Sequence, residues 1–361
     1  MTTVRTSRVA DPDLLDALRE RFAQSCTHEV VEAAEQCWSD ELWHDVVADG
    51  FAGVGVPEGA GGSGGTAVEA CAVLRAAGAY AVPLPLAESG LLAGWIAART
   101  GELPTGVVTV APPRRIPPIE QVDADTALLR GRLVRVPWAR NADHVLVLVD
   151  AGRAVAVVPR ELLTIQPGAN LAGEPRDTIE FADAPVPIHR LTAAADPDEL
   201  YRWGALSRAA LIAGALQRTA ELTVRYTSER CQFGRPVARF QAVQQHLVTL
   251  AEVSALTTMA VEVAAAAVAG GRGAHESAAA KIVAGQSAVA AARAAHQAHG
   301  AMGVTREYPL HQLTRRLNAW SREYGSERHW AAVLGREVVD RGADALYPFI
   351  TDPSQGEELS E

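Results

Sequence analysis

Apolar residues in the first hundred positions of the chain recur every three or four residues. The first group is Leu14, Leu15, Leu18 and Phe22, which follows the helix-start signal Asp11-Pro12. The run Gly59–Gly65 has too much glycine for a regular helix or strand and predicts a loop, after which Ala67–Ala79 resumes a helical composition. We therefore expect this part to be helical.

The pattern changes after Pro104 to short β-rich runs separated by turn residues. These runs are Val107–Val110, Ala127–Leu129, His144–Val149, Ala154–Val158 and Thr178–Phe181. Runs of this length and composition predict strands. Pro185, Pro187 and Pro197 mark the end of the small β-domain that the strands predict.

From Asp198 onward the pattern is again helical, with long intervals between helix breakers. Phe240, Val243, Leu247 and Leu250 fall on one helical face, which predicts core packing. A second long helix is expected over 275–299. The apolar stretch 255–270 is interrupted by Glu262, so it indicates a buried bundle helix and not a membrane span.

These patterns predict a mainly α protein with a small β-domain. The expected domains are an N-terminal helical domain over 1–103, a middle β-domain over 104–192 and a C-terminal helical bundle over 193–361. A chain of 361 residues is also longer than one ordinary compact core, so more than one domain is expected.

Composition narrows the possible functions. A net charge of −10 argues against nucleic-acid and anionic-membrane partners, which reward clustered Lys and Arg. Cys26, Cys37, Cys71 and Cys231 lack CxxC spacing, and the start of the chain has no leader pattern, so we expect neither disulfides nor a metal site. These features predict a cytoplasmic protein without a membrane span.

The residues with the clearest chemistry lie in two segments, 230–244 and 297–310. Arg230 offers a permanently charged guanidinium that can bond two oxygens of a pyrophosphate at once. The amides of Gln241 and Gln297 suit the polar edges of an adenosine, and the Gly300-Ala301 pair allows close approach of the backbone. The two segments must therefore meet in space to bind one dinucleotide.

These segments resemble the acyl-CoA dehydrogenases, which carry R-x-x-F-G-x-x-x-x-x-x-Q and later Q-x-x-G-G-x-G followed by E-Y-P. The N-terminal pattern Leu42–Glu58 is also similar to that family. The resemblance implies the acyl-CoA dehydrogenase fold, with a four-helix-type C-terminal bundle that builds a tetramer. It further implies an FAD site across a subunit interface, whose residues here would be Arg230, Phe233, Gln241, Gln297, Ala298, His299, Gly300 and Ala301.

The residue that would act as the catalytic base is missing. Family members remove a proton alpha to a thioester with a glutamate, often in a Tyr-Glu-Gly-Thr turn, and Tyr324 stands at that place here. Glu323 lies one position early, about 100° away on a helix, and is only a weak candidate. A second branch of the family has its glutamate at the end of the long helix, where this chain has alanines, with Glu262 about two turns earlier.

The middle domain also departs from the family. The Thr-Glu-Pro and Trp-Ile-Thr motifs that hold the flavin ring are absent, and Trp138 lacks the expected hydroxyl neighbours. Arg316 stands where an acidic residue usually follows Arg315, and Ala205 replaces an arginine on the CoA side. The residues that would serve a partner's flavin are thus present, and those that would serve the chain's own flavin ring are not.

This asymmetry is similar to the non-catalytic β subunit of actinobacterial α2β2 acyl-CoA dehydrogenases. That resemblance implies a homologous catalytic subunit as partner, a bulky acyl-CoA such as a steroid-derived thioester bound mainly by that partner, and an electron-transfer protein as acceptor. Two alternatives remain open: a self-sufficient homotetrameric enzyme with Glu323 as a displaced base, and a flavin-free scaffold of the same fold.

Overall fold

Five helices and several short turns make up the N-terminal part of the computed structural model, which describes residues 9–347 except 36, 115–116, 124, 193–195, 343 and 345. The helices are α1 (Pro12–Ser25), α2 (His28–Ala34), α3 (Asp40–Ala48), α4 (Ala67–Ala79) and α5 (Ala93–Thr100), the last preceded by a π-helical turn η3 (Ala87–Leu92). Asp11 caps α1, and Thr66 with Glu69 forms a capping box that starts α4. The N-terminal part is therefore helical, as predicted, and the glycine-rich run 59–65 connects the short turns before it to α4.

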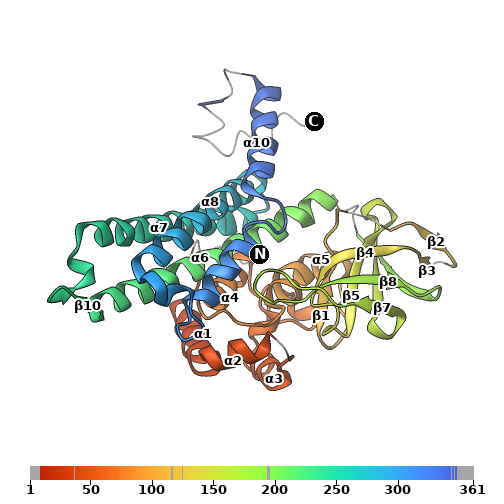
Figure 1. Ribbon diagram of the computed structural model, residues 1–361. Coiled ribbons are helices and arrows are strands. Elements are labelled where there is room, and N and C mark those ends of the chain that lie inside the picture. The colour runs from red at the N-terminus through yellow and green to blue at the C-terminus, as the bar shows by residue number, and fades with distance from the viewer. Residues whose placement is uncertain are drawn as a thin grey trace.

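The β-domain contains two sheets. The larger has the order β1-β5-β6-β9-β3-β2, and the smaller has the order β4-β8-β7. The strands are β1 (Val108–Val110), β2 (Ile119–Gln121), β3 (Thr126–Leu129), β4 (Arg132–Pro137), β5 (His144–Val149), β6 (Ala154–Pro159), β7 (Leu163–Gln166), β8 (Arg176–Phe181) and β9 (Pro185–Arg190). Figure 1 shows these strands gathered at one end of the molecule.

Strand β9 contains Pro185 and Pro187, which the sequence analysis took as the end of the domain. The first half of β9 pairs only with β3, and the second half, from Ile188, pairs with β6. Prolines are tolerated in a strand where one of its sides is unpaired, because no ladder partner then needs their missing N–H. The β-rich region thus continues to Arg190.

Long helices dominate the C-terminal part: α6 (Pro197–Glu229), α7 (Gln241–Ala269) and α8 (Ala274–His299), followed by α9 (Leu310–Trp320) and α10 (Glu327–Arg341). Gly214 of α6 and Gly78 of α4 let these two helices approach closely. A Cβ added at Gly214 would lie 1.7 Å from the Arg75 carbonyl oxygen. Figure 1 shows α10 projecting away from the rest of the bundle.

One hydrophobic core joins the first and last parts of the chain. It runs from Leu18 and Phe22 of α1 through α4 and α6 to Leu317 and Trp320 of α9. The strands have a separate core that includes Val145. Helices α4 and α6, which lie before and after the strands in the sequence, pack on each other. The β-domain is therefore an insertion between two halves of one helical unit.

Helix α7 is less buried than its apolar sequence predicted. By length and composition this helix could cross a membrane, yet only 22% of its most apolar window is buried. Its exposed apolar side chains include Val248, Leu256, Met259 and Val263. The described part of α7 therefore presents an exposed apolar face, the kind of surface through which proteins often interact.

Candidate nucleotide-binding cleft

A tight hairpin follows α6 and shapes the first motif. Strands β10 (Cys231–Gln232) and β11 (Arg235–Pro236) are joined by Phe233 and Gly234, whose φ angles are 51° and 79°. Positive φ at both central residues is the requirement of a type I′ turn, which explains the glycine. The turn leaves Phe233 91% exposed at the tip.

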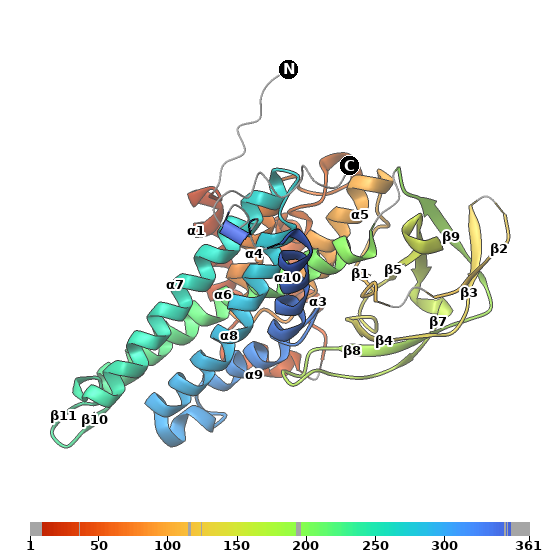
Figure 2. The same cartoon turned by 90° about the horizontal axis from the view of Figure 1, so that it is seen from above.

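The two motif segments meet in a cleft of about 390 Å³, as the sequence analysis predicted for a shared ligand. The lining includes Arg230, Phe233, Gln297, Ala298, His299, Gly300 and Ala301. Figure 2 shows the segments that line it, hairpin β10–β11 and the turn after α8, at the end of the bundle farthest from the β-strands.

Three further residues complete the description of this cleft. Gln241 is the first residue of α7, is exposed and lies outside the lining, so its role stays a prediction. Phe240 and Val243, predicted to be core residues, line the cleft instead. The helical face that they share with the buried Leu250 therefore serves both the core and the cleft.

Arg230 is the cation of the cleft. It directly follows the last residue of α6, and its backbone is extended (ψ 115°). Its side chain lines the cleft. It is exposed and makes no ion pair with another described residue. An unpaired guanidinium at this place suits an anionic pyrophosphate, which would accept charge-assisted hydrogen bonds from it.

His299 forms a buried aromatic wall of the cleft. Its ring stacks on Tyr226 with centroids 4.5 Å apart, and its Nδ1–H donates to the Ala295 carbonyl oxygen at 2.8 Å. Burial lowers the pKa of His299, so the ring is neutral. Its Nε2 is then an acceptor, and it has no hydrogen-bond partner among the described residues.

Gly300 ends α8 with φ 60° and ψ −139°, a conformation that side chains other than hydrogen disfavour. The turn η7 (Gly300–Val304) then carries the chain along the cleft. Space near Gly300 is open, since a Cβ built there meets nothing within 4 Å. A ligand can therefore contact the backbone directly at Gly300, where the family motif has a glycine.

Glu323 lies in a second region, between α6 and the small sheet. Its carboxylate accepts from Arg176 Nε at 2.8 Å, from Arg176 Nη2 at 2.9 Å and from Arg208 Nε at 2.8 Å. Asn170 Nδ2 donates a further bond at 3.0 Å. Burial alone would raise the pKa of Glu323, but the two guanidinium charges outweigh burial and hold the pKa well below its usual range.

The surrounding ion pairs form a charge-balanced buried layer. Arg208 also binds Glu88 at 2.5 Å, Arg176 binds Glu174 at 3.0 Å, and Arg316 lies 3.5 Å from Glu174. Three guanidinium groups therefore face three carboxylates. Lys281 is buried beside this layer, donates to the Ser321 carbonyl oxygen, and has its pKa lowered by burial to about 7.

Tyr324, at the position of the family glutamate, is also buried. Burial raises its pKa, and its hydroxyl oxygen has no hydrogen-bond partner among the described residues. Neither Tyr324 nor Glu323 is therefore poised to accept a proton near neutral pH. Arg208, whose guanidinium lies 5.1 Å from the Tyr324 ring centre, ties both residues to α6.

The cleft and this layer are separate places. Arg208 lies within α6 and Arg230 directly follows its last residue, 22 residues further along the chain (230 minus 208). At about 1.5 Å per residue they lie roughly 33 Å apart along the helix. Figure 2 accordingly shows hairpin β10–β11 at the end of the bundle far from the β-domain.

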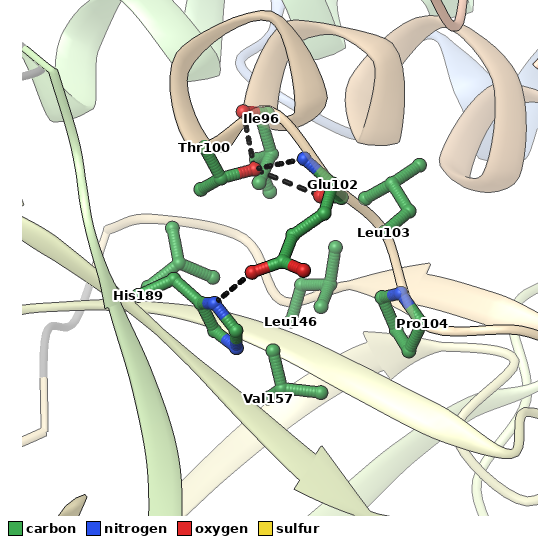
Figure 3. Close-up of a pocket in the computed structure, with 9 residues that line it drawn as sticks. Ile96, Thr100, Glu102, Leu103, Pro104, Leu146, Val157 and His189 are labelled. Atoms are coloured by element: carbon green, nitrogen blue, oxygen red, sulfur yellow. Dashed lines mark hydrogen bonds and ion pairs between the residues drawn. The ribbon is translucent and has the colours of Figure 1, made fainter. Parts of the chain in front are cut away.

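A third cavity, of about 200 Å³, lies between α5 and the larger sheet (Figure 3). Its walls are mostly aliphatic, and the Glu102 carboxylate and His189 Nδ1 pair across it at 2.8 Å. None of the residues predicted from sequence as functional lines this cavity. It is a packing gap between the helical unit and the β-domain.

Comparison with known proteins agrees with this geometry. The model of the acyl-CoA dehydrogenase N-terminal domain matches residues 12–102, and that of the C-terminal domain matches residues 199–337. Acyl-CoA dehydrogenase IpdE2 of Mycolicibacterium smegmatis is 26% identical over 89% of this chain and 96% of its own length. Acyl-CoA dehydrogenase FadE27 of Mycobacterium tuberculosis is 30% identical over 60% of this chain and 64% of its own length.

The fold is shared with a solved structure of the ChsE4-ChsE5 complex from Mycobacterium tuberculosis, with a TM-score of 0.81. That match is 24% identical and covers 94% of this chain and all of the other. The chain belongs to the acyl-CoA dehydrogenase family, oxidoreductases that act on CH–CH bonds with FAD. The cleft fits that cofactor through its free guanidinium, its exposed aromatic ring and its glycine turn.

Proposed function

We propose that this chain is the FAD-completing, non-catalytic subunit of a heterotetrameric acyl-CoA dehydrogenase. In this proposal the chain supplies the pyrophosphate and adenosine contacts of a flavin whose ring lies in a catalytic partner. The observation that carries the proposal is the separation of about 33 Å, along α6, between the intact cleft and the chain's own altered active-site region.

Each cleft residue has a defined task in this proposal. Arg230 binds and orients the pyrophosphate, the 297–301 segment faces the adenosine, and Phe233 covers the ligand from the hairpin tip. Bound FAD supplies a hydride acceptor for desaturation of the acyl-CoA. His299, the last residue of α8, stays neutral and offers its Nε2 as a hydrogen-bond acceptor.

The state of Glu323 supports a base contributed by the partner. A general base must hold a lone pair free near the working pH, and its pKa should lie near that pH. Glu323 instead accepts bonds from Arg176, Arg208 and Asn170, and its pKa is strongly lowered. Its contacts favour an ion-pair role over the alternative of a displaced base.

Assembly with a second acyl-CoA dehydrogenase chain is supported by α7. The helix has no Lys or Arg, and its exposed face carries Val248, Leu256, Met259 and Val263. A charge-poor helical face of this kind matches a similar face on a homologous subunit. The fold shared with the ChsE4-ChsE5 complex, which contains two unlike chains, adds to this support.

The substrate and the acceptor are part of the same proposal, and a steroid ACAD among the fold neighbours supports the substrate. The acyl group would be a bulky, steroid-derived thioester bound mainly by the partner. An electron-transfer protein would reoxidise the flavin, an idea that an electron-transferring flavoprotein among the fold neighbours supports. Oxidation of the thioester and reoxidation of the flavin both belong to the assembled complex and not to this chain alone.

Expression with and without a candidate partner gene tests the proposal. Alone, the chain should be colourless and inactive in dye-linked acyl-CoA oxidation. Co-expressed with its catalytic partner, it should give a yellow complex with one flavin for every two polypeptides. A yellow, active protein from the single gene would favour the self-sufficient homotetramer.

Replacement of Arg230 by alanine tests the interface role. Loss of a charge-assisted contact of about 1.5–3 kcal/mol should lower flavin affinity in the complex by at least tenfold. Arg225→Ala removes another exposed arginine, five residues earlier on α6, and serves as the control. Unchanged flavin occupancy in Arg230→Ala would count against the proposal and favour the flavin-free scaffold.

A further inference from the structure

Three aromatic rings pack together beside the nucleotide cleft, and they come from three separate segments. Tyr226 belongs to α6, His299 is the last residue of α8, and Tyr308 lies two residues before α9. The ring centroids are 4.5 Å apart for Tyr226 and His299, 5.0 Å for His299 and Tyr308, and 5.5 Å for Tyr226 and Tyr308. Each ring therefore packs on both others, in the offset and tilted arrangements that aromatic rings favour. We call these three residues the aromatic triad.

The aromatic triad joins the two segments that line the cleft. Tyr226 lies one turn before Arg230, whose backbone N–H donates to the Tyr226 carbonyl oxygen at 2.9 Å. His299 directly precedes Gly300, where the turn η7 begins. The stack of His299 on Tyr226 therefore holds the start of η7 in a fixed place relative to Arg230.

Tyr308 anchors the third segment through its hydroxyl group. This hydroxyl donates to the Leu222 carbonyl oxygen on α6 at 3.1 Å. Burial raises the pKa of Tyr308, so the hydroxyl keeps its proton and stays a donor. Tyr308 itself lies outside the lining of the cleft, so its contacts can affect a bound ligand only through the residues that it supports.

We propose that Tyr308 is a positioning residue for the cofactor, because it sets the spacing between Arg230 and the 297–301 segment. The inference rests on the proposed function, in which Arg230 binds the pyrophosphate and the 297–301 segment binds the adenosine. A ligand that carries both groups binds tightly only when both places already stand at the matching distance. Without the Tyr308 anchor, a smaller fraction of the molecules has that spacing, and the apparent dissociation constant rises by the same factor.

Isothermal titration calorimetry of the full-length chain, with ADP and with inorganic pyrophosphate, tests this role. ADP spans both places, whereas pyrophosphate needs Arg230 alone. Tyr308→Phe keeps the ring and removes the hydroxyl, so it should weaken ADP binding about fivefold and leave pyrophosphate binding unchanged. A residue that only stabilises the fold would change neither affinity or would change both together.

Tyr80→Phe is the matched control. Tyr80 is another half-buried tyrosine that packs against the helical core, and it lies outside the cleft. Its replacement should change neither affinity. Tyr308→Leu removes the ring as well, so His299 loses a packing partner and ADP should bind about twentyfold more weakly than to the wild type. Thermal unfolding of each variant verifies that the fold is retained.

Arg230→Ala separates a failure of this inference from a failure of the proposed cleft. Both are wrong if the wild-type chain binds no ADP at millimolar concentration, or if Arg230→Ala binds ADP as tightly as the wild type does. The role of Tyr308 alone is overturned if Tyr308→Phe binds ADP normally or loses affinity for ADP and pyrophosphate equally. Equal weakening of ADP binding in Tyr80→Phe would overturn it too.

Discussion

Glu323 links three elements of the fold through its carboxylate. Replacing it by glutamine removes the carboxylate that Arg176 and Arg208 share, leaving Glu174 and Glu88 as their remaining partners and the buried layer one negative charge short, which costs about 3–5 kcal/mol in comparable buried pairs. We expect the free energy of unfolding of Glu323→Gln, measured in urea, to fall by that amount. Activity per bound flavin in the complex should be unchanged, since the proposed function takes the base from the partner.

The matched control is Glu229→Gln, which breaks the exposed pair with Arg225. Exposed pairs contribute little, so its unfolding free energy should change by less than ~0.5 kcal/mol. The pKa of Glu323 is lowered on folding, so its stabilisation is present above the usual glutamate pKa of 4.5 and is lost as the pH falls further. Equal stability of Glu323→Gln and wild type would contradict the buried ion-pair role.

Lys281 gives a pH dependence of the same sign in a higher pH range. Its pKa is lowered by burial to about 7, so between pH 7 and its unfolded value of 10.5 the unfolded chain binds more protons than the folded chain. Stability therefore rises with pH over this range, by roughly 2 kcal/mol from pH 7 to 9. Lys281→Met should lack this rise in the free energy of unfolding. The prediction is wrong if the stability of Lys281→Met and of the wild type depends on pH in the same way.

At the scale of elements, the contact of α4 with α6 depends on glycine. Alanine at Gly214 places a methyl group 1.7 Å from a backbone carbonyl oxygen, so the two helices must separate. We expect a loss of about 1–3 kcal/mol or more in thermal or urea unfolding. Gly335→Ala on α10, where a Cβ meets nothing within 4 Å, should instead be neutral or stabilising by up to ~1 kcal/mol.

Elements with strong local signals could be predicted from sequence. Helix α4 begins and ends at the expected residues, and β5 has the expected bounds, because apolar periodicity and turn residues are local properties. Strand β9 was missed because its prolines fit only where one of its sides is unpaired, which depends on register with β3 and β6. Strands β2, β4 and β7 were not predicted; β2 and β7 are only three and four residues long, which is too short for a clear pattern.

For the candidate site, motifs predicted the meeting of Arg230 with the 297–301 segment. They could not predict the surroundings of Glu323, whose partners Arg176 and Arg208 are 147 and 115 residues away in the chain. Phe240 and Val243 were assigned to the core because a helical stripe alone does not distinguish a core from the wall of a cleft.

At the scale of the whole molecule, the exposed face of α7 predicts association. Met259 is 58% exposed between other apolar side chains of that face. Met259→Glu should place a charge in the interface and reduce the mass of the co-expressed complex, measured by light scattering. Val122→Glu, at a similarly exposed residue beside β2, is the control; an unchanged mass in Met259→Glu would exclude α7 from the interface.

The core shared by α1, α4, α6 and α9 has a consequence for synthesis on the ribosome. When the strands up to Arg190 have emerged, the apolar sides of α1 and α4 still lack the helices that bury them, because those helices are translated last. A nascent chain at this stage exposes apolar surface until α6 arrives. Chaperone capture of the early helices would therefore be a normal step in the production of this protein.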